Sequence, residues 1–248
     1  MSKSSPVKIG VFVPGECQLL DLACIDVFYM MSKEYLSVLP MLPKHIPDIA
    51  PSVEIFYITS PEAKAKAETI LLTANLNIRA THDITDAEVQ PGKLDVVLVP
   101  GPDPSASWEK HILDFLQAHS RCETTDILSV CTGIFLCGAA GLLDGRTACG
   151  PRGLQDIVQK KHPTAKLVGE KYRWIQDRNF WSSGGVTNGN DLVAAYARVG
   201  KHFPSAVVEI ACKMADVGDR GQVYSESQTA FTIGVVWQLI KGLFVKRR

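Results

Sequence analysis

The chain has 248 residues, of which 46% are hydrophobic and 21% are charged, a balance typical of an ordinary soluble globular protein. Its 26 basic residues equal its 26 acidic residues, so no overall charge favours nucleic acid or an acidic lipid surface as a partner. The length suits one large α/β domain, and we expect a single domain over residues 1–248.

The chain alternates apolar strands with helices. In chain order the expected strands are 7–13, 53–59, 70–72, 76–78, 94–99 and 125–130, with two or three more between 166 and 183. The expected helices are 19–32, 108–119, 132–143, 150–161, 189–202, 205–215 and 227–243. The main strands are continuous apolar runs, which is typical of strands covered on both faces. We therefore predict a doubly wound, mostly parallel sheet with helices on both faces.

Two segments need separate interpretation. Four prolines between residues 33 and 52 interrupt any long element, so this stretch is predicted to be a loop-like insertion. The helix expected over 227–243 is apolar but contains Gln238 and Lys241, and it is shorter than the roughly 20 residues that cross a membrane. We expect this helix to pack on the protein, with a solvated basic end at residues 246–248, and we expect no membrane partner.

The strongest chemical signal is Cys131. The strand at 127–130 runs straight into this cysteine, and a helix of small residues follows without room for a loop. A cysteine at such an elbow lies at the amino end of a helix, whose unpaired N–H groups and dipole favour the thiolate. Serine nucleophiles of hydrolases occupy the same kind of turn. Cys131 is thus the candidate nucleophile, and a small buried apolar residue is the alternative interpretation.

A nucleophile needs a proton acceptor and donors for a developing negative charge. The Thr132 N–H follows the elbow and is one natural donor, and the turn at Gly101 is the other place from which main chain could approach. Asp21 lies within an apolar frame and is the first-choice carboxylate, with helix capping as its alternative role. Glu16 is the second-choice carboxylate.

The run ILSVCTGIFLCGAAGLLDGRTA closely resembles the nucleophile elbow of the ThiJ/PfpI superfamily, which has the class I glutamine amidotransferase-like fold, a flavodoxin-like sandwich. The stretches IGVFVPGECQLLDLACIDVF, VVLVPGP and SSGGVTNGNDL resemble its other signatures in the same order, so the resemblance covers most of the chain. The chain looks most similar to the isocyanide hydratase branch, where an aspartate in an LDL-type sequence faces the elbow cysteine. The resemblance implies Cys131 as nucleophile, Asp21 as acid/base and a homodimer.

The sequence departs from the family pattern at three places. The opening motif has one more residue between Gly15 and Asp21 than expected, which is why Glu16 is kept as the second-choice carboxylate. Gly150 stands where many members carry a histidine, which weakens a Cys-His-Glu glyoxalase mechanism. Pro102 follows Gly101 at the oxyanion turn, and proline has no N–H to donate. Near the end of the predicted sheet, Gly184-Gly185 is expected either to bring backbone close to the pocket or to form a tight turn.

Three functions follow as hypotheses. The first is a hydro-lyase that hydrates a small isocyanide to an N-substituted formamide through Cys131 and Asp21. The second is a non-catalytic sensor of oxidative stress in which Cys131 is oxidised to a sulfinate. The third is glyoxalase or deglycase activity on α-oxoaldehydes. The seven cysteines form no CxxC pair and the N-terminus lacks a signal-peptide pattern, so we expect reduced thiols, a cytoplasmic location and no metal or cofactor.

Overall fold

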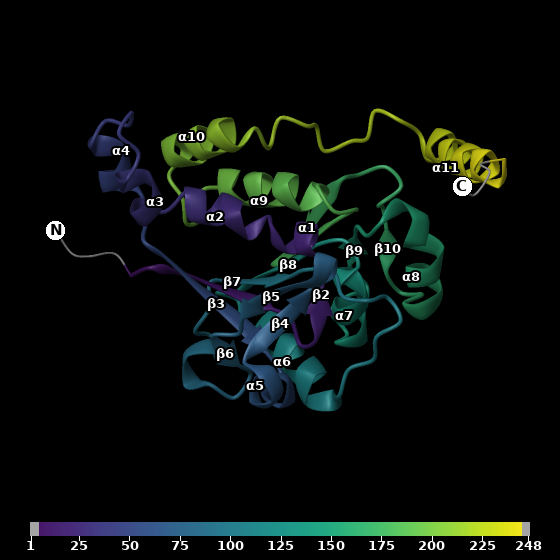
Figure 1. The fold of residues 1–248 in the computed structure, drawn as a ribbon, viewed down its shortest axis with the longest axis horizontal. Helices are drawn as coiled ribbons and strands as arrows, with labels where there is room; N and C mark the ends of the chain where they lie inside the picture. The colour runs from purple at the N-terminus through teal and green to yellow at the C-terminus, as the bar shows by residue number, and fades with distance from the viewer. Residues whose placement is uncertain (1–4, 245–248) are drawn as a thin grey trace.

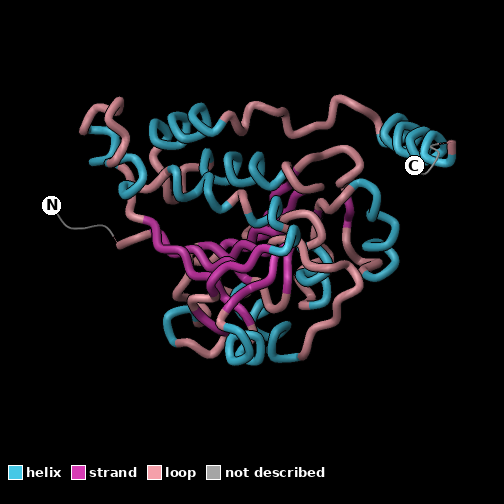
Figure 2. Tube along the Cα trace, in the orientation of Figure 1, coloured by secondary structure: helices cyan, strands magenta, loops and turns pink. Residues whose placement is uncertain are grey.

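A computed structural model describes residues 5–244. Its centre is a seven-stranded sheet in the order β11-β12-β8-β7-β1-β3-β6 (Figure 2). The strands of this sheet are β1 (Val7–Phe12), β3 (Val53–Thr59), β6 (His82–Asp83), β7 (Val96–Val99), β8 (Asp126–Ser129), β11 (Trp174–Asp177) and β12 (Phe180–Ser183). All neighbours pair in parallel except β11 and β12, which are antiparallel. The predicted doubly wound, mostly parallel sheet is confirmed.

Two small sheets accompany the central one. The first joins β2 (Glu16–Cys17), β4 (Thr69–Leu72) and β5 (Leu76–Arg79), and its β4–β5 pair is the predicted hairpin. The second pairs β9 (Thr147–Ala148) with β10 (Lys166–Leu167). Three short 3₁₀ turns occur at η1 (Thr73–Asn75), η2 (Ala87–Val89) and η3 (Arg152–Leu154).

The helices flank both faces of the sheet. They are α1 (Leu19–Leu22), α2 (Ile25–Met30), α3 (Lys33–Ser37), α4 (His45–Ile49), α5 (Pro61–Ala67), α6 (Lys110–Ser120), α7 (Gly133–Ala139), α8 (Gln155–Lys161), α9 (Asn188–Arg198), α10 (Ser205–Ala215) and α11 (Gln228–Leu243). Helices α2, α9 and α10 lie on one side of the sheet, and α5, α6 and α7 lie on the other (Figure 1). Side chains of β7 alternate between two apolar cores, with Val96 and Leu98 in one and Val97 and Val99 in the other. Burial on both faces explains why these strands are continuously apolar.

The strand order places the Cys131 elbow at the end of an interior strand of the central sheet. Strand β8, which leads into Cys131, lies between β7 and β12, and Ser129 is in register with Val99 on one side and Ser182 on the other. The carboxyl ends of the three strands therefore meet at one edge. The turns that follow β7 and β12 contain Gly101 and Gly185, so both turns approach Cys131.

Three local predictions need correction. Residues 33–52, expected to be loop-like, contain two short helices, α3 and α4. Pro47 falls within the first turn of α4, where a missing N–H costs no helical hydrogen bond. The helix expected over 19–32 is divided into α1 and α2. Helix α5 was not expected from the sequence, although Ser60 caps it by accepting from the Ala63 N–H at 3.1 Å.

The expected packing of the last helix holds only at its start, where Gln228 and Phe231 contact Arg152. An extended segment carries the chain from α10 to α11, which lies at one end of the molecule (Figure 1), and none of the residues of α11 is buried. Among residues 5–244, no helix combines the length and apolarity that crossing a membrane requires. The basic residues expected to be solvated, 246–248, lie outside the described part of the chain.

Candidate active site

Cys131 lies on a sharp turn between β8 and α7. Its φ of 55° is in the left-handed region, which is strained for a residue with a side chain and persists where the surroundings impose it. Val130 anchors the turn by donating its N–H to the Val99 carbonyl at 3.0 Å. Only 6% of Cys131 is exposed. The strand-to-helix elbow that the sequence predicts is therefore present in the structure.

Two glycines allow helices to start close to this elbow. A Cβ at Gly133, the first residue of α7, would collide with the carbonyl oxygen of Val99 on the neighbouring strand. A Cβ at Gly189, in the first turn of α9, would stand 2.8 Å from the Val130 side chain. The Cys-Thr-Gly sequence thus has a steric basis, because its glycine is the residue that lets α7 begin against β7.

Asp21 is fully buried beside Cys131. Its Oδ2 accepts a hydrogen bond from the Gly101 N–H at 3.2 Å, and the neighbouring Cys131 thiol lowers the pKa of its carboxyl group. Within residues 5–244 its Oδ1 has no hydrogen-bond partner. Asp21 is the third residue of α1, whose N-cap is Gln18, so the carboxyl does not cap the helix. The alternative structural role proposed for Asp21 is therefore wrong.

Burial decides the ionisation of the Asp21–Cys131 pair. It raises the pKa of Asp21 to about 7, although the hydrogen bonds from Cys131 and Gly101 act in the opposite direction. Burial, and next the charge of Asp21, raise the pKa of Cys131 to about 11, although main-chain hydrogen bonds from Val186 and Thr132 favour the thiolate. The predicted lowering of the thiol pKa is thus wrong, because desolvation outweighs the helix N-terminus. Near neutral pH the thiol therefore keeps its proton, and the Asp21 carboxyl is divided between its protonated and its ionised form.

The donors around sulfur differ partly from those expected. The Thr132 N–H faces Cys131 as the elbow predicts, and the second main-chain donor is Val186. Val186 follows the Gly184-Gly185 turn and has a φ of 24°, so this turn does bring backbone to the site. The Gly184-Gly185 pair predicted that backbone approaches the pocket here, but the prediction named Gly185 and not Val186, whose N–H is the donor.

Gly101 has a different role from the expected one. Its N–H is directed at Asp21, and a Cβ at this position would collide with both the Asp21 carboxyl and the Thr132 hydroxyl. The Thr132 hydroxyl in turn donates to the Pro102 carbonyl at 2.7 Å. The Pro-Gly-Pro turn therefore holds the carboxylate and the elbow together, and Pro102 contributes through its carbonyl group.

A cavity of about 400 Å³ opens next to these groups. It is lined by Glu16, Cys17, Gln18, Thr73, Gly101, Pro102, Asp103, Pro104 and Thr132. Glu16 is exposed on its wall, whereas Asp21 is the carboxyl in contact with the thiol. Gly150 is buried against Ile134 and Gln155 and does not line this cavity. No group of three or more His, Cys, Asp or Glu side chains within residues 5–244 is arranged to hold a metal ion.

The fold and the site define a doubly wound α/β protein with a cysteine elbow. The family model described as DJ-1/PfpI matches residues 57–198, more than half of the chain, and the chain belongs to this family. It is 30% identical over 128 residues to an isonitrile hydratase of Pseudomonas putida; the match spans 51% of this chain and 52% of that relative, about half of each.

Solved structures share the fold across nearly the whole chain. A ThiJ/PfpI family protein from Pseudomonas syringae superposes with a TM-score of 0.68 at 19% identity, covering 97% of this chain and 88% of that one. An AraC family transcriptional regulator from Pseudomonas putida gives 0.63 at 14% identity, covering 85% of this chain and 100% of that one. Since these relatives include a regulator, the fold leaves the activity undefined.

Proposed function

We propose that the protein is a cysteine-dependent hydro-lyase that converts a small isocyanide into an N-substituted formamide. The observation that carries the proposal is the burial of the Asp21 carboxyl beside the Cys131 thiol, which raises the pKa of Asp21 to about 7. A general base works best when its pKa lies near the working pH, and this carboxyl meets that condition beside the nucleophile. The similarity to an isonitrile hydratase over half the chain supports the same reaction class.

The first half of the reaction forms a covalent intermediate. The Asp21 carboxylate accepts the thiol proton, and the Cys131 sulfur attacks the terminal carbon of the isocyanide, so a carbon–sulfur bond forms. Asp21 returns the proton to that carbon, which yields a thioimidate. The main-chain N–H groups of Thr132 and Val186 stabilise the negative charge on sulfur during attack.

The second half consumes water. Asp21 takes a proton from a water molecule as the water oxygen bonds to the carbon, and the same proton passes to the substrate nitrogen. The carbon–sulfur bond then breaks as the hydroxyl proton returns to sulfur through Asp21. The products are an N-substituted formamide and the original thiol. No step needs an oxidant, a reductant or an imidazole, which suits a chain with Gly150 at the expected histidine position.

The experiment is conversion of an aryl isocyanide by the full chain, followed as formamide by mass spectrometry. Wild type should produce formamide, while Cys131→Ser and Asp21→Asn should lose conversion with folded-state circular dichroism retained. Cys122→Ser, on a half-buried cysteine in the turn that follows α6, is the matched control and should keep full activity. Absence of formamide with the wild-type chain would reject the proposal.

A redox sensor is the second candidate, favoured by one observation. Asp21 can carry a proton near neutral pH, and a protonated carboxyl can donate to a sulfinate oxygen on Cys131. The raised pKa of the thiol weighs against it, since oxidation proceeds through the thiolate. Mild peroxide treatment and mass spectrometry separate the two: a sensor accumulates Cys131 sulfinate in the wild type and loses it in Asp21→Asn. Glyoxalase chemistry has less support, because no histidine is among the groups that shift the pKa of Cys131.

A further inference from the structure

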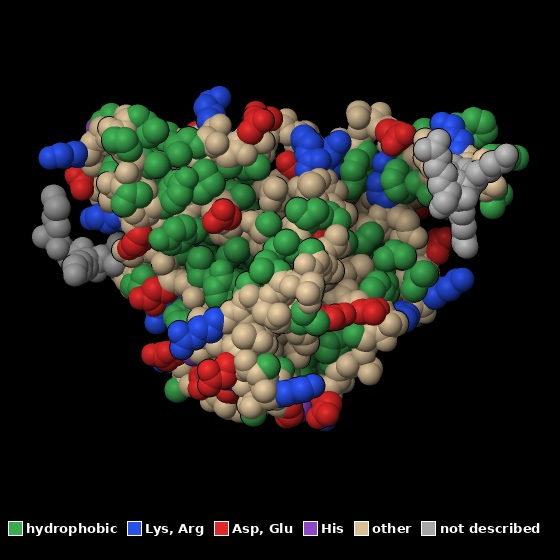
Figure 3. All heavy atoms as spheres, viewed as in Figure 1, with side chains coloured by type: hydrophobic (Ala, Val, Ile, Leu, Met, Phe, Trp, Pro, Cys, Tyr) green, Lys and Arg blue, Asp and Glu red, His purple; other side chains and the backbone are tan. Residues whose placement is uncertain are grey.

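Helix α11 presents apolar side chains that nothing in residues 5–244 covers. Seven of its large apolar residues and the following Phe244 are exposed, and Leu243 and Phe244 keep 82% and 80% of their surface. Figure 3 shows these hydrophobic side chains at the upper right of the molecule, on the helix that stands at its end. An apolar helix is ordinarily buried in a protein core, in an interface with a partner or in a membrane. The exposed apolar surface of α11 therefore indicates a binding site.

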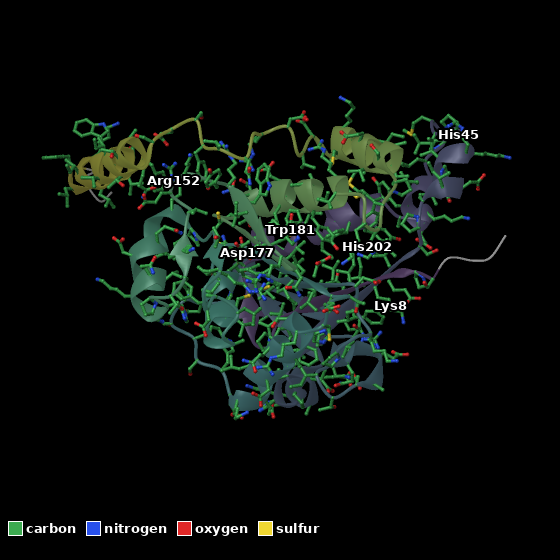
Figure 4. All side chains as sticks on the ribbon, turned by 180° about the vertical axis from the view of Figure 1, so that it is seen from behind. Lys8, His45, Arg152, Asp177, Trp181 and His202 are labelled. Carbon is green, nitrogen blue, oxygen red and sulfur yellow. The ribbon has the colours of Figure 1, made fainter. Side chains whose placement is uncertain are left out.

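Only the beginning of the helix is attached to the protein. Arg152, which lies beside α11 in Figure 4, donates from Nε to the Gln228 side chain at 3.0 Å. Its guanidinium group also stacks over the ring of Phe231 at 4.5 Å and donates to the Glu226 carbonyl at 3.2 Å. These contacts fix where the helix starts. Thr232, Val235 and Val236 line a cavity of about 260 Å³ between the helix and the protein. The large apolar side chains at the far end, Leu239, Leu243 and Phe244, stay exposed and can meet a surface beyond the protein.

The apolar residues form a continuous face. At about 100° per residue, Ile233, Trp237, Ile240 and Phe244 fall on one side of α11. A narrow polar stripe that contains Gln238 and Lys241 borders this face. An apolar face with Trp and aliphatic side chains can lie at the level of lipid headgroups, with a bordering lysine directed to the lipid phosphates. With 16 residues and about 1.5 Å of rise each, α11 reaches about 24 Å, less than the roughly 30 Å of a bilayer core.

Charge identifies the kind of surface. Residues 228–248 contain four cations, Lys241, Lys246, Arg247 and Arg248, and no acidic residue. This local excess of positive charge is not visible in the net charge of the whole chain, which is zero. An anionic surface attracts these charges. Lys241 also lies 5.4 Å from the centre of the Trp237 ring, which places a cation beside an aromatic residue of the apolar face.

We propose that α11 binds anionic lipid surfaces, with its apolar face inserted at the level of the headgroups and its cations paired with lipid phosphates. The body of the protein, including the Cys131 site, then stays on the aqueous side. The proposal is independent of the reaction at Cys131, because α11 contributes no residue to that site.

The test measures co-sedimentation of the full chain with vesicles of phosphatidylglycerol and phosphatidylcholine in equal parts, against vesicles of phosphatidylcholine alone. Binding should occur with the anionic vesicles and weaken in about 0.5 M salt, where charges are screened within a few ångströms. Each cation near an anionic surface strengthens binding about fivefold, so changing residues 246–248 together to Gln should weaken it about a hundredfold.

The matched control changes three exposed lysines elsewhere, Lys66, Lys93 and Lys160, to Gln, which alters the total charge equally and should leave binding unchanged. A second variant, Trp237→Asp with Phe244→Asp, should abolish binding without unfolding the chain, because both side chains are exposed. Absence of binding to anionic vesicles would overturn the proposal. So would an equal loss in the lysine control. Sedimentation velocity showing a dimer that the Asp variant dissolves, with no vesicle binding, would assign α11 to a second copy instead.

Discussion

Replacing Asp21 with Asn should change how stability depends on pH. Folding raises the pKa of Asp21 from 3.8 to about 7, because the carboxyl group is buried. The folded state therefore binds this proton more tightly than the unfolded state does. The resulting stability is fully present below the unfolded pKa and is lost as pH rises through the folded pKa. Ionised Asp21 thus destabilises the wild-type fold above about pH 7.

The size of the effect follows from the shift. A change of about 3 pKa units at about 1.4 kcal/mol per unit gives about 4 kcal/mol between about pH 4 and pH 8. The asparagine side chain of the variant would carry no charge at any of these pH values. The free energy of unfolding of Asp21→Asn, minus that of wild type, should therefore increase by about 4 kcal/mol over this range. Any constant loss from a weaker hydrogen bond to Gly101 cancels in that comparison.

Urea unfolding at several pH values measures this difference directly. Asp103→Asn is the control of opposite sign: hydrogen bonds from Ser105 lower the pKa of the exposed Asp103 carboxyl, so its ionised form stabilises the fold as pH rises. The stability of Asp103→Asn relative to wild type should accordingly fall as pH rises toward the ordinary pKa of 3.8 and then stay level at higher pH. A difference for Asp21→Asn that stays flat between pH 4 and pH 8 would refute the burial argument and the acid/base role that depends on it.

Three further predictions concern the site. If Asp21 is the base, kcat/KM for an isocyanide should rise with pH through about 7, and this step should be absent from any residual activity of Asp21→Asn. Gly101→Ala should lose most activity and about 1–3 kcal/mol of stability, because the added Cβ would collide with Asp21 and Thr132. Gly185→Ala is the control, because nothing lies within 4 Å of its added Cβ, and its losses of activity and stability should be smaller. Thr132→Val should lower kcat and cost about 1 kcal/mol in urea unfolding, because it removes the 2.7 Å hydrogen bond to Pro102, and an unchanged kcat would mean that this link does not position the elbow.

The sequence by itself determined the features that depend on neighbouring residues. Continuous apolar runs predicted strands buried on both faces, and the structure has them in a mostly parallel sheet. The passage from strand to cysteine to small-residue helix predicted the elbow, and Cys131 has the left-handed φ that such a turn requires. Asp21 stood out as a carboxylate in an apolar frame, and it is fully buried.

Only the tertiary structure decided how these groups act on one another. The hydrogen bond that orients Asp21 comes from Gly101, 80 residues away, and the second donor to sulfur comes from Val186 on another strand end. The pKa of Cys131 rises rather than falls because packing from several elements removes water, which no local pattern records. The same limit applies to α11. Its apolar sequence would suit a packed or an exposed helix equally, and only the position of the rest of the chain shows that it is exposed.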